Sequence, residues 1–77
     1  MIPTDDEIIA LLGSGEYSTA QVTLMLEGWD AVPEDRIERR KFLARRGSYF
    51  TRLKKMKRRG EVCQRVEGHV ALWSVKE

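Results

Sequence analysis

The sequence predicts a small α+β domain in which three to four helices precede a C-terminal β-hairpin. Helix-capping patterns and apolar residues three or four positions apart recur from Thr4 to Arg59. After Gly60, apolar residues alternate with polar ones in two runs separated by Glu-Gly-His, which is typical of a hairpin. A chain of 77 residues has room for one such domain, over 1–77.

The first helix is indicated by its two ends. Thr4 and Glu7 have the spacing of a capping box, in which each side chain accepts a hydrogen bond from the other residue's backbone. Ile8, Ile9 and Leu12 then share one apolar face, and Gly13 and Gly15 are expected to end the helix.

A second capped helix follows a short extended segment. Either Ser18 or Thr19 is expected to cap this helix, and Gln21 has capping-box spacing when Ser18 is the cap. Tyr17 before them is expected to form a strand of one or two residues. The residues of this helix expected to be buried are Val22, Met25 and Leu26.

The stretch from 34 to 46 predicts a separate basic helix. Pro33 followed by two acidic residues is typical of a helix start, and Gly47 is typical of a helix end. Its apolar residues Ile37, Leu43 and Ala44 line up only loosely, and Phe42 points elsewhere.

The stretch "SYFTRLKKMKRRG" predicts a further helix over 48–59, with Ser48 as its cap. Its apolar stripe consists of Tyr49, Phe50, Leu53 and Met56. The opposite side of this helix is polar and cationic.

Charge is divided sharply along the chain. Residues 1–35 hold eight acidic and no basic side chains, whereas 36–77 hold all 14 basic side chains and four acidic ones. The net charges of these halves are −8 and +10, and between 36 and 59 the ratio of basic to acidic residues is 12 to one. Such a density is unfavourable through self-repulsion, and it suits a polyanionic partner.

Catalysis and metal binding lack their usual residues in this sequence. One histidine, His69, and one cysteine, Cys63, supply neither a nucleophile with its base nor a set of metal ligands. We therefore expect no enzyme activity, no small-molecule substrate, no metal and no cofactor. The single cysteine cannot form an internal disulfide, and no apolar run is long enough to cross a bilayer, so we expect a cytoplasmic protein.

The order of these elements resembles the winged helix-turn-helix superfamily of DNA-binding domains. "EYSTAQVTLML" looks like the strand and second helix of that fold, "SYFTRLKKMKRRGEV" like its recognition helix and first wing strand, and "HVALWSV" like its second wing strand. About twenty residues separate the second helix from the recognition helix, where the family has a short turn. Either 34–46 is an inserted helix, which we favour because only then does the Tyr17 strand have a place, or 34–46 and 48–59 form the helix-turn-helix.

In either arrangement, helix 48–59 is the one that such proteins place in the major groove, and the hairpin at 61–75 is the wing. The residues expected to face base edges are Ser48, Thr51, Lys55 and Arg58. Those expected to contact phosphates are Arg45, Arg46, Arg52, Lys54 and Arg59, and the wing would add Arg65 and His69. The resemblance implies sequence-specific binding of duplex DNA by a small transcriptional regulator or DNA-transacting accessory protein of prokaryotic or phage type, with a homodimer as an option.

Protein interaction is the second hypothesis. The basic face would bind an acidic partner protein or the acidic half of a second copy, with Leu24 and Trp29 as contact residues, unless Trp29 covers the edge of the core. RNA ranks lower, because Tyr49 and Phe50 lie on the packing stripe and leave no exposed platform for bases. A membrane surface ranks lower too, because the core needs the apolar face of helix 48–59.

Overall fold

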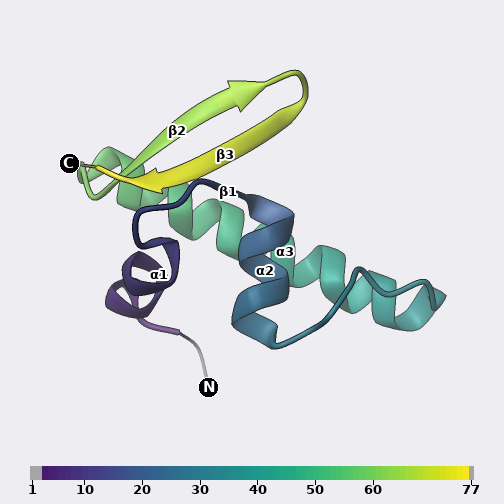
Figure 1. The fold of residues 1–77 in the computed structure, drawn as a ribbon. Coiled ribbons are helices and arrows are strands. Elements are labelled where there is room, and N and C mark those ends of the chain that lie inside the picture. The colour runs from purple at the N-terminus through teal and green to yellow at the C-terminus, as the bar shows by residue number, and fades with distance from the viewer. Residues whose placement is uncertain (1–2, 77) are drawn as a thin grey trace.

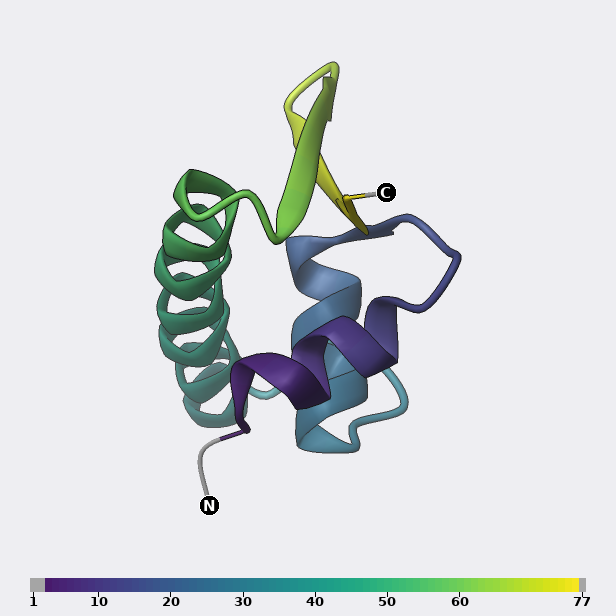
Figure 2. The same ribbon diagram turned by 90° about the vertical axis from the view of Figure 1, so that its left-hand side faces the viewer.

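The computed structural model describes residues 3–76, which form three helices and a three-stranded antiparallel sheet. The helices are α1 (Asp5–Leu12), α2 (Thr19–Glu27) and α3 (Arg36–Arg58), and the strands are β1 (Tyr17–Ser18), β2 (Val62–Glu67) and β3 (Val70–Val75). The predicted α+β class is confirmed. The three helices lie together on one side of the sheet, and the β2–β3 hairpin projects beyond them (Figures 1 and 2).

Both predicted capping boxes are present. The Thr4 hydroxyl accepts from the Glu7 backbone N–H at 3.2 Å, and the Ser18 hydroxyl accepts from the Gln21 N–H at 3.1 Å. Each box satisfies backbone donors that the first turn of a helix leaves without partners. The helix starts at α1 and α2 are therefore set by a few neighbouring residues.

The sheet has the order β1-β3-β2, so the two-residue strand at Tyr17 pairs with the last strand of the chain. Tyr17 lies opposite Trp73. The hairpin turns through Gly68 and His69, because Glu67 and Val70 are its last paired residues. Gly68 has a φ of 63°, a conformation that side chains with a Cβ rarely adopt.

The core lies between the three helices and the inner face of the sheet. Its buried residues are Ile8, Leu12, Val22, Leu53, Met56, Val62 and Trp73. Trp73 is fully buried, its indole N–H donates to the Thr19 hydroxyl at 2.8 Å, and its ring meets Phe50 edge-on at 5.9 Å between centroids. These contacts fix the hairpin against α2 and α3.

The region of α3 corrects the sequence prediction. One helix of 23 residues spans Arg36–Arg58, so the separate helix at 34–46, its end at Gly47 and the cap at Ser48 are all wrong. Asp35 is the N-cap, and its carboxylate accepts from the Ile37 backbone N–H at 3.3 Å. Pro33 therefore lies before the helix.

Burial explains why α3 continues through Gly47. Phe42 and Tyr49 are seven residues, or about two turns, apart, and they are only 2% and 6% exposed. Both rings can lie on the inner side only if the backbone between them is helical. The favourable packing of two aromatic rings outweighs the intrinsic penalty of about 1 kcal/mol for glycine inside a helix.

The three apolar residues that line up only loosely in this segment are exposed. Ile37 is 67% exposed and Leu43 is 44% exposed, and Ala44 is exposed as well. Phe42 is buried instead, with its ring 5.8 Å from that of Trp29, so Trp29 covers the edge of the packed region.

In α2 the outcome is mixed. Val22 is buried as expected, but Met25 is 39% exposed. Thr23 is fully buried in its place, and its hydroxyl donates to the Thr19 carbonyl oxygen at 2.8 Å. A buried threonine is tolerated there because this hydrogen bond satisfies its polar atom.

Candidate nucleic-acid interface

The platform of the candidate interface is α3, whose 23 residues extend over about 34 Å. Tyr49, Leu53 and Met56 hold its C-terminal half against the core, while its N-terminal part reaches beyond the end of α2 (Figure 1). The sides of α3 that do not face the core carry most of the basic residues of the chain.

One row of arginines on α3 faces acidic residues of other elements. Arg45, Arg52 and Arg59 recur every seven residues, which places them on the same side of the helix. Arg52 Nε donates to Asp5 Oδ1 at 2.8 Å, and Arg59 pairs with the other oxygen of Asp5. Arg45 Nε lies 3.7 Å from Glu27 Oε1.

Glu27 also ties α2 to α3 through a buried hydroxyl. The Tyr49 hydroxyl donates to Glu27 Oε1 at 2.8 Å. Burial and this carboxylate raise the pKa of Tyr49 to about 12, because both disfavour the phenolate. The Tyr49 hydroxyl therefore stays protonated and uncharged at physiological pH.

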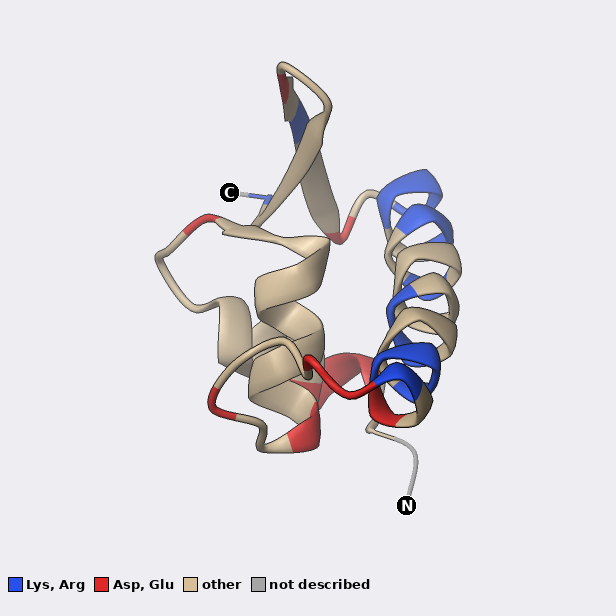
Figure 3. Ribbon diagram, turned by 90° about the vertical axis from the view of Figure 1, so that its right-hand side faces the viewer, with Lys and Arg blue, Asp and Glu red and all other residues tan. Residues whose placement is uncertain are grey.

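Eight other cations of α3 have no ion-pair partner among residues 3–76, and all eight are exposed. They are Arg36, Arg39, Arg40, Arg46, Lys54, Lys55, Lys57 and Arg58. Two of them have other contacts: Lys54 lies over the ring of Phe50 at 5.5 Å, and Lys57 donates to the Gln64 amide at 3.0 Å. Figure 3 shows Lys and Arg recurring along α3, whereas many Asp and Glu residues lie at the start of α1 and around the end of α2.

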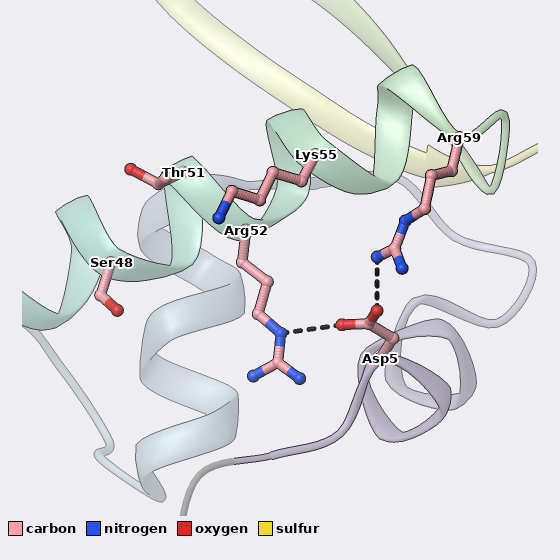
Figure 4. A pocket seen from close by; sticks show the side chains of 6 residues that line it. All are labelled: Asp5, Ser48, Thr51, Arg52, Lys55 and Arg59. Atoms are coloured by element: carbon pink, nitrogen blue, oxygen red, sulfur yellow. Dashed lines mark hydrogen bonds and ion pairs between the residues drawn. The ribbon is translucent and has the colours of Figure 1, made fainter.

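A hollow of about 540 Å³ opens on the side of α3 that faces the start of α1. We call it the Asp5 hollow, and its lining residues are Asp5, Ser48, Thr51, Arg52, Lys55 and Arg59 (Figure 4). Hydrogen bonds from Arg52 and then Arg59 hold the pKa of Asp5 below its usual value, so its carboxylate is ionised at neutral pH. Three cations and one carboxylate give the hollow a formal charge of +2.

Five of the eleven predicted DNA-binding residues meet in this hollow: Ser48, Thr51, Arg52, Lys55 and Arg59. The Thr51 hydroxyl donates to the Gly47 carbonyl oxygen at 3.1 Å, which leaves its lone pairs available to a ligand. By its sequence position, Asp5 is an acidic residue in the first turn of a helix, where its charge suits the helix dipole. Its position opposite two arginines joins segments 47 and 54 residues apart, so no local pattern could have indicated it.

The other predicted residues are spread more widely. Lys54 and Arg58 are exposed on α3 outside the Asp5 hollow, and Arg45 is at the Glu27 pair. Arg46 lines a second hollow, of about 440 Å³, between α3, the start of α2 and the hairpin tip, together with His69. This second hollow includes Leu43, Phe50 and Val70 and is therefore more apolar in character.

Arg65 is held by acidic residues of the chain itself. Its guanidinium donates two hydrogen bonds to Glu16, and Nη1 lies 3.1 Å from Glu67 Oε2. This arginine lowers the pKa of the Glu16 carboxyl, and Glu16 in turn raises the pKa of Arg65. Two carboxylates therefore neutralise the only basic side chain of the hairpin strands.

Comparisons of the chain with protein-family models, with curated proteins and with solved structures gave no match. Over residues 3–76, no helix has the length and apolar character needed to span a membrane. Within the same range, no three His, Cys, Asp or Glu side chains gather closely enough to hold a metal ion.

Proposed function

We propose that this protein is a winged-helix DNA-binding protein that places α3 in the major groove of duplex DNA, with the β2–β3 hairpin as its wing. The observation that carries the proposal is the set of eight exposed cations on α3 without an ion-pair partner among the described residues. A duplex offers a matching array of phosphates and releases condensed counterions when they are neutralised. An α-helix of ordinary width fits the major groove, which is about 12 Å wide.

Within this proposal the polar residues of α3 have different roles. Ser48, Thr51, Lys55 and Arg58 approach base edges. Lys54, Arg46 and the Arg52 and Arg59 pair contact phosphates, which position the helix without reading sequence. We also propose that the protein acts in transcription regulation or in another DNA transaction of prokaryotic or phage type.

The experiment is fluorescence anisotropy of a labelled random duplex, repeated from about 50 to 200 mM salt. We expect the duplex to bind, and the logarithm of the binding constant to fall by about 0.9 per phosphate contact for each tenfold rise in salt concentration. A slope that corresponds to roughly four to six contacts would fit this surface. Lys55→Gln should weaken binding more than Lys76→Gln. The second variant is the control, because it removes the same charge from the residue that follows β3. No binding at the lowest salt would refute the proposal.

Recognition of a particular DNA sequence by α3 is tested separately. Selection from a random duplex pool should yield altered sites for Thr51→Ala and Lys55→Gln, whereas Arg59→Gln should weaken all sites about equally. Uniform loss for all three variants would remove the assignment of a base-reading face while leaving DNA binding in place.

A second candidate function, protein binding, is favoured by one observation. Leu43 and Val70 are 44% and 48% exposed at the second hollow, which is also lined by Arg46, an exposed cation without an ion-pair partner among the described residues. An acidic protein segment with an apolar residue would fit this surface. Sedimentation of the protein alone at low salt tests the form in which that segment comes from a second copy, and a strict monomer at high concentration excludes it.

A further inference from the structure

We propose that the Asp5 hollow binds one phosphodiester group of the DNA backbone, and that Asp5 is an internal anion that competes with this phosphate for Arg52 and Arg59. The inference rests on the proposed function. It adds one anion site, at which the Asp5 carboxylate competes with the phosphate for Arg52 and Arg59. Its ligand class is a phosphate oxyanion, because the hollow offers the guanidinium groups of Arg52 and Arg59 against one carboxylate. Lys55 adds positive charge at the same hollow, while Ser48, Thr51 and Lys55 keep their assignment to base edges.

The hydrogen bonds of the two arginines leave donors for such a ligand. Arg52 donates to Asp5 through Nε only, so that neither of its terminal nitrogens has a partner among the described side chains. Figure 4 shows the Lys55 side chain lying along α3 toward Ser48 and Thr51, which brings its ammonium group to the same hollow. A guanidinium with free terminal nitrogens binds phosphate oxygens in a fixed geometry.

Asp5 is placed to oppose a phosphate. Its two oxygens take one arginine each, so it occupies the space between Arg52 and Arg59 that an oxyanion would prefer. Its side chain is 28% exposed, and a ligand can therefore approach without unfolding α1. Without the carboxylate, the formal charge of the hollow would rise from +2 to +3, Arg52 would be free to donate, and Arg59 would keep only its Nε contact with Glu61 Oε1 at 3.4 Å.

The test compares Asp5→Asn with Asp6→Asn in the anisotropy assay at about 50 mM salt. Both variants remove one negative charge from the first turn of α1, but Asp6 is exposed and has no ion pair within the described residues. We expect Asp5→Asn to bind duplex DNA about fivefold tighter or more, because a unit charge about 4 Å from a phosphate changes the affinity by that order even in a watery medium. Asp6→Asn should change the affinity less than twofold.

A gain of affinity is diagnostic, because a variant that merely folds less well would bind more weakly. The gain should also disappear when Asp5→Asn is combined with Arg52→Gln and Arg59→Gln, since the site it unmasks would be gone. Equal effects of Asp5→Asn and Asp6→Asn, or weaker binding by Asp5→Asn, would overturn the inference while leaving DNA binding intact.

Failure of the proposed function would be visible separately. If the wild type binds no duplex, titration of Asp5→Asn with inorganic pyrophosphate shows whether the Asp5 hollow binds phosphate anions independently of DNA. The NMR signals of the Arg52 and Arg59 Nε–H groups should then shift together and saturate at millimolar pyrophosphate. Unmoved signals would show that the hollow has no affinity for phosphate anions.

Discussion

Replacing Gly47 by alanine should stabilise the protein, because Gly47 lies inside α3 and not at a helix end. Apart from its chain neighbours and the nearby backbone of α3, a Cβ at this position meets nothing within 4 Å, so alanine fits without rearrangement. Glycine inside an exposed helix is less favourable than alanine by about 1 kcal/mol, since it loses more backbone freedom on folding. For a domain of 77 residues, 1 kcal/mol corresponds to a rise in Tm of about 4 to 8 °C.

Thermal unfolding followed by circular dichroism measures this change, and Gly60→Ala is the matched control. Gly60 has a φ of 79°, where a Cβ costs about 1 to 2 kcal/mol, so the same substitution should lower the Tm there. A lower Tm for Gly47→Ala would mean that Gly47 has a left-handed conformation at a helix end. The continuous α3 would then be refuted, together with the interface built on it.

Three further predictions concern the core, the pH dependence and the hairpin. Trp73→Phe should lower the free energy of unfolding in urea by about 2 kcal/mol, because it removes a buried hydrogen bond and leaves a cavity; an unchanged midpoint would contradict the packing. The unfolding free energy should fall as pH rises from about 10 to 12, by up to about 1.4 kcal/mol per pH unit, since the unfolded state loses the Tyr49 proton first. This decline should be absent in Tyr49→Phe, and its persistence would assign it to another group. Arg65→Gln should weaken DNA binding less than Arg58→Gln in the anisotropy assay, because carboxylates already neutralise Arg65; an equal loss would make Arg65 a phosphate contact.

Local patterns were sufficient for the parts of the fold that local interactions hold. The capping boxes at Thr4 and Ser18 were readable because their partners lie three residues away. The hairpin was readable because alternation and a glycine turn are short-range signals. The stripe of Tyr49, Leu53 and Met56 was correct for the same reason, since its spacing lies within a few helical turns.

The prediction failed where a local signal competed with packing. Gly47 and Ser48 together resemble the end of one helix and the cap of the next, and that signal was given too much weight. Phe42 and Tyr49 are seven residues apart, so a helix that continues through Gly47 places Phe42 on the same apolar stripe as Tyr49. The missed signal was therefore present, but it crosses the helix boundary that Gly47 and Ser48 indicate.

Three properties could be derived from the amino-acid sequence alone: the α+β class, the division of charge, and the basic character of the segment that forms α3. These properties depend on composition and on neighbours along the chain. Which cations are neutralised depends on the folded chain, because ion pairs such as Asp5 with Arg59 and Glu16 with Arg65 join residues about fifty positions apart. Which basic residues can bind a polyanion depends on that pairing in space, and charge along a sequence does not specify it.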